Sequence, residues 1–420
     1  MKGFKNFHSF ESFLSSLGMF RMKPGLERMN KCLEMLDLSS LNVTVVQIVG
    51  TNGKGSTACF LESLARHNSL KTGLYTSPHL VSVKERILVN RVLLHEEVWV
   101  EAANVVYHNC GHCNLSYFEF LTIMAVFIFE QEQVDLAIME AGLGGHHDAT
   151  SAVNPALNVF TQVGLDHTHI LGKTVEEISK DKSMAMRGGS AVLARQDKAS
   201  MDIFKARGKE VGAELFSVPD FFDFSSDSLK FRLLPEMTFS EDDLGLKGNY
   251  QKDNAATALL AWYILAETQD YESDIDDCAA GLKNAFWPGR MHIAQRLPMV
   301  ILDGAHNVSS MKALKYALEM MEVRPATVIF SCMKDKDVMG LTEVVTSFGA
   351  DNILVQDIRD NPRAMPGKEL AAMLGACASV LDDTEKYLTG LTAHQSPVLV
   401  CGSLYLLGYI YALFPEWLER

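Results

Sequence analysis

A glycine-rich segment that contains a lysine is the part of the sequence whose residue types and spacing most clearly indicate chemistry. It consists of Gly50, Thr51, Asn52, Gly53, Lys54, Gly55 and Ser56. An apolar run at residues 45–49 precedes it, and a helix-like stretch at residues 57–66 follows it. Such a strand, turn and helix N-terminus form a phosphate cradle, because backbone N–H groups and the helix dipole attract an anion and the lysine adds positive charge. The alternative is a flexible glycine turn between a core strand and a core helix.

The segment departs from the strict phosphate-loop pattern at two positions. That pattern places glycine where Ile48 stands and a hydroxyl residue where Gly55 stands. The hydroxyl after the lysine normally binds Mg²⁺. A metal bound beside this segment must therefore take some or all of its oxygen ligands from other parts of the chain.

Three polar residues that follow apolar, strand-like runs have the chemistry of metal ligands: Ser77, Glu140 and His167. Open α/β sheets place their ligands at such strand ends. A buried carboxylate there is costly unless a cation or hydrogen bonds compensate it. Each residue alone has an ordinary alternative, which is a turn serine, a helix-capping carboxylate or a hydrogen-bonded histidine. Three of them after three successive strands favour a metal site.

A second polar group follows the strand-like run at residues 299–303 and contains Asp303, His306 and Asn307. Asp303 has the chemistry to accept a ribose hydroxyl or to orient a polar partner. The alternative is a turn in which Asn307 caps a helix. Lys182 lies in a charged, helix-like stretch, for which a solvated lysine is the expectation from pattern alone.

The elements that must position these residues alternate between strand-like and helix-like stretches. In the first half of the chain they are expected at residues 45–49, 72–76, 118–133, 134–140, 156–163 and 174–187. This rhythm indicates a largely parallel sheet covered by helices. Residues 215–247 change character, and segments 220–227 and 229–234 predict short antiparallel strands before a helix at residues 251–268.

Proline and glycine within residues 286–290 break the helical pattern and mark the predicted domain boundary. Beyond it a second alternation predicts a smaller α/β domain, so the expected division is 1–287 and 288–420. The strands of this second domain are expected at residues 299–303, 326–331, 352–356 and 398–401. Its helices are expected at residues 309–321, 367–376 and 404–414.

Length and composition limit the class of protein. A chain of 420 residues with 48% hydrophobic content supports two domains with sizeable cores. The net charge of −14 argues against a nucleic-acid partner, which would need a basic surface. The N-terminal stretch lacks a long apolar core and no apolar run reaches membrane-spanning length, so neither a signal segment nor a membrane partner is expected. The eight scattered cysteines suit a reducing compartment, so the expected localisation is cytoplasmic.

Taken together, these motifs resemble those of the folylpolyglutamate synthase family, and most closely its bacterial bifunctional dihydrofolate synthase/folylpolyglutamate synthase members. That family is related to the cell-wall Mur ligases. The resemblance covers nearly the whole chain, and the motifs occur in the family's order. They lie at residues 50–56, 77–80, 117–120, 140–145, 148–150, 164–168, 254–256, 288–290 and 303–307.

The resemblance implies an ATP-dependent ligase that adds L-glutamate to dihydropteroate and to the γ-carboxylate of reduced folates through an acyl phosphate. It implies an N-terminal P-loop ATPase-like α/β domain, with a mostly parallel sheet and a small antiparallel subdomain. A smaller, Rossmann-like C-terminal α/β domain is expected to follow as the glutamate ligase domain. The implied cofactors are ATP and two Mg²⁺ ions, with a monovalent cation as a further candidate, and the expected molecule is a monomer.

The resemblance also assigns roles to individual residues. It assigns ATP binding to Thr51, Asn52, Gly53, Lys54, Gly55, Ser56, Asn254, Arg290, Asp303 and His306. It assigns metal binding to Ser77, Glu140, His167 and Lys182, the last as a carbamate formed with CO₂. It assigns the pteroate pocket to Ser116, Tyr117, Phe118, Glu119, His147, Asp148 and Ala149. It assigns catalytic roles to Lys54, Lys182, His167 and Arg290.

The sequence departs from the family pattern beside two of these sites. Ser183 and Met184 follow Lys182 where the family usually has alanine and glycine, and His146 with His147 replaces a common arginine-leucine pair. Three other functions are alternatives to the bifunctional one. A monofunctional folylpolyglutamate synthase fits the same motifs. A Mur-type peptide ligase would need a UDP-binding domain before the first strand, and a non-catalytic nucleotide-binding regulator would lack the phosphate-loop lysine or the metal ligands.

Overall fold

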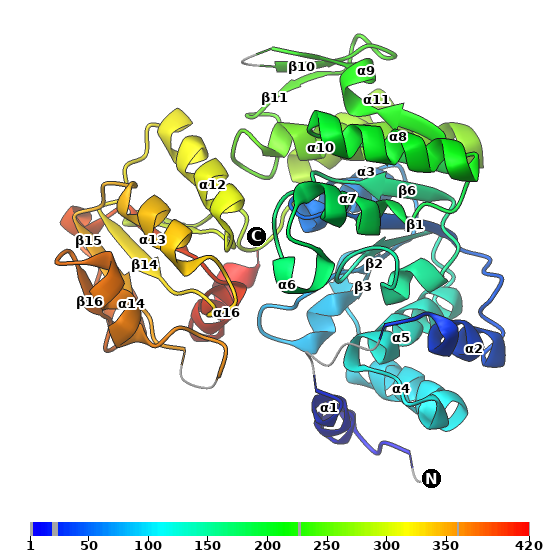
Figure 1. The fold of residues 1–420 in the computed structure, drawn as a ribbon, viewed down its shortest axis with the longest axis horizontal. Coiled ribbons are helices and arrows are strands. Elements are labelled where there is room, and N and C mark those ends of the chain that lie inside the picture. The colour runs from blue at the N-terminus through cyan, green and yellow to red at the C-terminus, as the bar shows by residue number, and fades with distance from the viewer. Residues whose placement is uncertain (1–2, 19–23, 226–227, 359–360, 420) are drawn as a thin grey trace.

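The computed structural model describes residues 3–18, 24–225, 228–358 and 361–419, which form two α/β parts lying side by side (Figure 1). Each part is built on its own mostly parallel sheet, and the first part carries an additional small antiparallel sheet. This confirms the predicted fold class. Residues 226–227, within the predicted segment 220–227, lie outside the described residues.

The sheet of the first part has, in the described residues, eight strands in the order β4-β3-β2-β5-β1-β6-β7-β8. All neighbouring strands from β2 to β8 pair in parallel, and only β3 and β4 at one edge pair antiparallel. The strands are β1 (Thr44–Val49), β2 (Thr72–Tyr75), β3 (Ile87–Val89), β4 (Val92–Leu93), β5 (Leu136–Glu140), β6 (Leu157–Phe160), β7 (Ser190–Leu193) and β8 (Glu214–Ser217).

Helices cover both faces of this sheet because successive strand residues point to opposite sides. Val46 and Ile48 of β1 pack among α3 and α10, whereas Val45 packs among α4 and α5 on the other face. The helices of the first face are α3 (Lys54–His67), α10 (Gln251–Gln269) and α11 (Ile275–Asn284). Those of the other face include α1 (Phe7–Ser16), α2 (Glu27–Met35), α4 (Glu96–Cys110) and α5 (Tyr117–Gln131). Helices α7 (Val175–Ser183) and α8 (Lys198–Val211) pack against each other and share a hydrophobic core with β6 and β7.

The small antiparallel sheet lies above α10 in Figure 1 and joins β9 (Phe222–Phe224), β10 (Ser228–Phe231) and β11 (Thr238–Ser240). It confirms the predicted change of character, with one difference. Residues 215–217, which lie at the start of the stretch expected to change character, belong to β8, which pairs in parallel with β7. These residues extend the large sheet because they pair with the free edge of β7 before the chain leaves the sheet.

The second part has a six-stranded sheet, within the described residues, in the order β12-β13-β17-β14-β15-β16. Only β12 runs antiparallel to its neighbour. The strands are β12 (His292–Arg296), β13 (Met299–Leu302), β14 (Thr327–Phe330), β15 (Asn352–Val355), β16 (Ala378–Val380) and β17 (Val398–Cys401). Three helices pack on one face, namely α12 (Val308–Met320), α13 (Val338–Thr346) and α14 (Gly367–Leu374). The other face carries α15 (Thr384–Thr389) and α16 (Leu404–Leu413).

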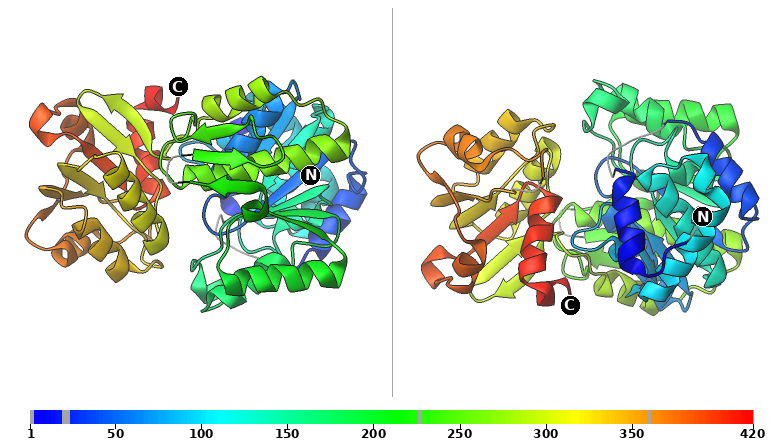
Figure 2. Two further views of the ribbon diagram at one scale, coloured as in Figure 1. Left: turned by 90° about the horizontal axis from the view of Figure 1, so that it is seen from above. Right: turned by 90° about the horizontal axis from the view of Figure 1, so that it is seen from below.

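The two parts meet along α16, which faces the first part in Figure 1 and in both views of Figure 2. The contact is close, because a Cβ added at Gly408 of α16 would come within 2.1 Å of the Leu80 carbonyl oxygen. Strands β2, β5, β1 and β6 are neighbours in the first sheet, so their carboxyl ends lie at one edge. Crevices at that edge are where open α/β sheets bind ligands. Across the described residues, none of the helices is long and apolar enough to cross a membrane.

Candidate active site

The glycine-rich segment forms the turn between β1 and α3. Gly53 is the N-cap of α3 and has φ +84°, and Lys54 begins the helix. The Lys54 ammonium donates hydrogen bonds to the carbonyl oxygens of Gly50 (3.1 Å) and Thr51 (3.3 Å). The first bond of the helix runs from the Thr57 N–H to the Gly53 carbonyl, so the N–H groups of residues 54–56 precede the helical ladder. They are therefore arranged to bind an anion.

Two glycines of this turn are required by close contacts. A Cβ at Gly50 would lie 1.8 Å from the Thr161 hydroxyl oxygen, and one at Gly53 would lie 2.3 Å from Asn254 Oδ1. Gly53 also has a backbone conformation that side-chain-bearing residues rarely adopt. The contact with Asn254 brings helix α10, and with it a predicted nucleotide-binding residue, directly to the phosphate loop.

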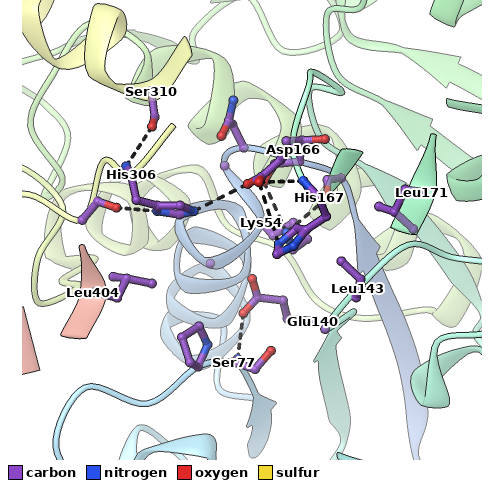
Figure 3. A pocket seen from close by; sticks show the side chains of 18 of the residues that line it. Lys54, Ser77, Glu140, Leu143, Asp166, His167, Leu171, His306, Ser310 and Leu404 are labelled. Atoms are coloured by element: carbon purple, nitrogen blue, oxygen red, sulfur yellow. Dashed lines mark hydrogen bonds and ion pairs between the residues drawn. The ribbon is translucent and has the colours of Figure 1, made fainter. Parts of the chain in front are cut away.

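The three predicted metal ligands lie beside this loop, as Figure 3 shows for Ser77, Glu140 and His167. Glu140 is the last residue of β5 and is 5% exposed. Its Oε2 accepts a hydrogen bond from the Ser77 N–H at 3.1 Å. Burial raises the pKa of the Glu140 carboxyl, although the positive charges of Lys54, Arg290 and Arg86 oppose that rise.

His167 follows β6 and is the N-cap of the short helix α6 (Thr168–Leu171), with φ +49°. Burial lowers its pKa to about 4, and the neighbouring Asp166 opposes that shift. The imidazole is consequently neutral at pH 7, which is the form that binds metals.

The donor set fits a hard divalent cation. No cluster of three or more His, Cys, Asp or Glu side chains suited to a metal occurs within the described ranges. A metal here must therefore combine the Glu140 carboxylate and the His167 imidazole with a hydroxyl such as that of Ser77. Glu140 supports the fit, because it is a buried carboxylate without an ion-pair partner among the described residues. A cation would offset its desolvation.

Lys182 is buried, in contrast to the solvated lysine expected from pattern alone. It lies in α7 and is 4% exposed. Burial, followed by repulsion from Lys54, lowers its pKa to about 7. Helix α7 packs against the turn after β5 so closely that a Cβ at Gly145 would lie 2.5 Å from the Lys182 carbonyl oxygen. A large share of Lys182 is thus the neutral amine near pH 7, and a neutral amine is the form that reacts with CO₂.

Asp166 is a site residue that the sequence analysis missed. Its Oδ1 lies 2.5 Å from the Lys336 ammonium of the second part, and its Oδ2 lies 3.6 Å from His306 Nε2. Asn307 Nδ2 donates to the same carboxylate at 3.4 Å. Burial acts to raise the pKa of Asp166, but the His306 hydrogen bond and the Lys336 charge hold it well below its usual range. Asp166 lies within the motif at residues 164–168, beside His167, but the motif gave it no role of its own, and nothing in the pattern marked Lys336.

The predicted residues of the second part lie across from the phosphate loop. Asp303 follows β13, and its carboxylate accepts hydrogen bonds from the Met291 N–H (2.8 Å), the Ala305 N–H (2.8 Å) and the Tyr250 hydroxyl (3.2 Å). Asp303 therefore holds the segment around Arg290 in place. His306 Nδ1 lies 2.8 Å from the Gly304 carbonyl oxygen, and a histidine nitrogen in that position donates.

Several of the residues predicted to form the pteroate pocket make hydrogen bonds and ion pairs that stabilise the local fold. Ser116 and Glu119 form the capping box at the start of α5, and Glu119 also pairs with Arg28 at 2.8 Å. Asp148 accepts hydrogen bonds from Leu143 N–H and Thr150, which hold the turn after β5. These groups shape a wall of the cavity.

His146 and His147, the pair at which the sequence departs from the family pattern, are stacked with ring centroids 4.0 Å apart. His147 lines the cavity, and both residues are exposed. An aromatic, titratable pair thus takes the place of an arginine-leucine pair at this wall.

One cavity of about 920 Å³ joins these groups, and residues of both parts line it. Every predicted site residue contributes to the lining with one exception, Tyr117. The Tyr117 side chain is 5% exposed and packs in the core, because it follows the N-cap of α5 on the face that turns toward the sheet. The residues that line the cavity are thus the phosphate loop, the metal-type donors, Lys182 and the polar group of the second part.

Comparisons with known proteins match both parts of the chain. The family model described as "Mur ligase middle domain" matches residues 48–262, and that described as "Mur ligase, glutamate ligase domain" matches residues 289–404. Among curated relatives, the "Dihydrofolate synthase/folylpolyglutamate synthase" of Bacillus subtilis (strain 168) is 31% identical over 413 residues, covering 93% of this chain and 95% of that protein.

Solved structures with a similar fold include "E.coli FolC in complex with DHPP and ADP", with a TM-score of 0.87, 27% identity and coverage of 98% of each chain. The bifunctional folylpolyglutamate synthase/dihydrofolate synthase of Yersinia pestis, complexed with AMPPNP and Mn ion, has a TM-score of 0.86 and 27% identity. That alignment covers 99% of this chain and 100% of the Yersinia chain.

Proposed function

This chain belongs to the dihydrofolate synthase/folylpolyglutamate synthase family of Mur ligases, and on that premise we propose that it joins L-glutamate to dihydropteroate and to the γ-carboxylate of reduced folates at the expense of ATP. One observation carries the proposal. A single cavity contains a phosphate loop, the buried Glu140 carboxylate, which has no ion-pair partner in the described part of the chain, and polar groups of the second part. An ATP-dependent ligation needs these three features together.

The first step activates a poor electrophile. A carboxylate oxygen of the pteroate or folate attacks the γ-phosphorus of ATP, the bond from that phosphorus to the bridging oxygen breaks, and ADP leaves. The substrate then carries an acyl phosphate. Lys54 and the N–H groups at the start of α3 hold the phosphates, and Arg290 faces them from the second part. Fixed positive groups of this kind offset the charge that develops on the transferred phosphoryl group.

The second step forms the amide. The amino group of glutamate attacks the acyl carbon, the bond from that carbon to the phosphate oxygen breaks, and phosphate leaves with the electron pair. The attacking nitrogen loses a proton to complete the amide. Because two anions and an amine must meet, positioning within the closed cavity accounts for much of the rate enhancement.

Metal ions complete the assignment. Ser77, Glu140, His167 and a carbamate on Lys182 are proposed to hold two Mg²⁺ ions, which when bound offset the negative charge of the phosphates and the carboxylate. The carbamate forms when the neutral Lys182 amine attacks CO₂ and releases a proton.

We assign residues 1–287 to the ATP and pteroate domain and residues 288–420 to the glutamate ligase domain, and we expect a cytoplasmic monomer. A bound monovalent cation is also part of the proposal.

The assay that tests this function measures ATP-dependent incorporation of radiolabelled L-glutamate, with dihydropteroate and a reduced folate as separate acceptors. Mg²⁺ and bicarbonate are supplied in both. We expect a labelled product from each acceptor and ADP formation that depends on the acceptor. Product from the folate alone would identify a monofunctional folylpolyglutamate synthase. A folded, nucleotide-binding protein that labels neither acceptor would overturn the assignment.

A further inference from the structure

Arg86 is a buried arginine that lines the cavity and that the proposed function has not used. It ends the short 3₁₀ turn Val83–Arg86, next to the start of β3, and is 3% exposed. Its Nε donates a hydrogen bond to His79 Nδ1 at 2.9 Å. The guanidinium carbon lies 5.4 Å from the centre of the Tyr117 ring. Two contacts therefore fix the plane of the guanidinium group.

The terminal nitrogens of Arg86 are available to a ligand. Arginine has donors and no acceptor, so His79 Nδ1 must accept and only the Nε of Arg86 is used in that bond. Within the part of the chain that the structure describes, Arg86 has no carboxylate at ion-pair distance, and its Nη atoms have no hydrogen-bond acceptor. A buried cation without an anionic partner is costly. Because it lines the cavity, Arg86 is placed to receive an anion from a substrate.

The other cations around the cavity are already paired or assigned. Lys336 pairs with Asp166, and Arg363 pairs with Asp335 at 2.7 Å. Arg195 lies 3.7 Å from Asp253. The cations that the proposed function assigns to the nucleotide and the metal ions are Lys54, Lys182 and Arg290. Arg86 is the cavity arginine left for a further negative charge.

The position of Arg86 indicates which anion this is. Ser403 and Tyr405 of the second part line the same cavity, and the charge of Arg86 acts on Tyr405, whose pKa burial raises. Arg86 thus lies where the first part meets the part that matches the glutamate ligase domain. Dihydropteroate has a single carboxylate, and the proposed reaction consumes it. L-Glutamate is the substrate common to both reactions whose carboxylates stay charged throughout.

We propose that Arg86 binds a carboxylate of the incoming L-glutamate and that His79 is the positioning residue that orients its guanidinium group. This assignment rests on the proposed function, because it names the subsite of one of its substrates. Arginine suits the task, since its planar fork matches a carboxylate with two parallel hydrogen bonds.

The test compares Arg86→Gln and Arg86→Lys with Lys84→Gln, a control in the same turn whose ammonium pairs with Glu96 at 3.2 Å, away from the cavity lining. Loss of charge-assisted hydrogen bonds predicts that Arg86→Gln raises KM for glutamate about 10- to 100-fold with both acceptors. KM for dihydropteroate and for ATP should stay unchanged. Arg86→Lys keeps the charge but loses the fork, so an intermediate rise is expected. Lys84→Gln should match the wild type.

His79 provides the second arm of the test. His79→Leu removes the acceptor that orients Arg86 and should also raise KM for glutamate. His79→Asn offers a side-chain oxygen near the position of Nδ1 and should restore most of the affinity. An ATP-induced rise in melting temperature equal to that of the wild type confirms that each variant is folded. If Arg86→Gln does not fold, Arg86→Lys and the His79 pair still decide the matter.

The outcomes separate this inference from the proposed function. A wild-type protein that ligates no glutamate contradicts the proposed function. An active wild type combined with an unchanged KM for glutamate in the Arg86 variants overturns only the present inference. A rise in KM for the reduced folate, with KM for glutamate unchanged, also overturns it, because Arg86 then binds the α-carboxylate of the folate. The wild type should use L-glutamine or L-isoglutamine poorly, and the analogue whose use Arg86→Gln leaves unaltered identifies the bound carboxylate.

Discussion

The carboxyl edge of the first sheet contains a buried carboxylate, the contact between the two parts contains one whose side chain is 10% exposed, and the two carboxylates have opposite surroundings. Glu140 at the end of β5 accepts one hydrogen bond from the Ser77 N–H and has no ion-pair partner in the described residues. Burial raises its pKa. Asp166 after β6 receives the Lys336 ammonium at 2.5 Å, and despite burial its pKa lies well below the usual range.

The difference indicates what each carboxylate is for. The protein itself satisfies Asp166, so this residue holds the second part against the first. Glu140 is left for a cation that the protein does not supply. Ion-binding sites are expected to contain buried groups like Glu140, whose unfavourable desolvation is offset when the ion binds. The following variants test this contrast, in order of decreasing expected effect.

Glu140→Gln should have the largest effect. Removing a group that is proposed to hold a cation near the transferred phosphoryl group is expected to lower kcat about 100- to 1000-fold. The measurement is the ligation assay at saturating ATP and glutamate. Glu97→Gln, an exposed residue of α4, is the matched control. Unchanged kcat in Glu140→Gln would show that the unpaired carboxylate does not serve the reaction.

Lys182→Ala tests whether a second anion joins Glu140 on this side of the cavity. Loss of the proposed carbamate is expected to lower kcat about 100-fold. Lys180→Ala, on the same helix but exposed, should leave kcat unchanged. In the wild type, carbamate should be detectable as a signal from labelled bicarbonate in NMR spectra. It should increase as pH rises through about 7, where the amine loses its proton. Equal activity of both variants would remove Lys182 from the mechanism.

Asp166→Asn tests the satisfied carboxylate. Removing the charge takes its ion-pair partner from Lys336, whose side chain is 9% exposed, and we expect kcat/KM for ATP to fall about 10-fold because the two parts close less often. A double-mutant cycle with Lys336→Met should give a coupling free energy of unfolding of about 0.5–3 kcal/mol. The control is the exposed pair Asp351–Arg324, which has a similar distance of 2.6 Å. Its coupling should be below about 1 kcal/mol. Equal coupling in the two pairs would contradict the account.

The pH dependence of stability should differ in sign between the two carboxylates. Without metal, the raised pKa of Glu140 means that its charged form destabilises the folded state at neutral pH, and this cost disappears as pH falls and the folded state takes up the proton. Glu140→Gln should therefore melt higher than the wild type at pH 7.5, by roughly a few degrees, and less so at pH 5.

For Asp166 the sign reverses. Its lowered pKa stabilises the folded state above the usual pKa range of a carboxyl group, and this stabilisation is lost only under acid conditions. Asp166→Asn should therefore melt lower than the wild type at both pH 7.5 and pH 5. Shifts of the same sign in the two variants at pH 7.5 would remove the contrast.

The sequence predicted one side of the site much better than the other. Ser77, Glu140 and His167 follow strands β2, β5 and β6, which lie next to β1, so a pattern of strand ends was enough to bring them together. The pairing of Asp166 with Lys336 joins residues 170 positions apart in separate parts, and only their packing creates it. Lys182 was expected to be solvated because the pattern of α7 does not show how closely the turn at Gly145 approaches it.

The sequence pattern also failed to predict several strands and the position of one side chain. Strand β3 and the edge strands β4, β12 and β16 are short or half-buried, so their sequences show little apolar alternation. Tyr117 was placed in the pocket because its neighbours belong there, but the start of α5 turns its ring into the core. In each case the missing information is a tertiary contact and not a local preference.

The central claim is that the γ-phosphate activates a carboxylate and is not lost to water. Dihydropteroate labelled with oxygen-18 in its carboxylate tests this directly, with mass spectrometry of the phosphate released during ligation. Formation of an acyl phosphate predicts that the label moves from the substrate into the phosphate in step with amide formation. Unlabelled phosphate, released while the amide forms at the normal rate, would contradict the account.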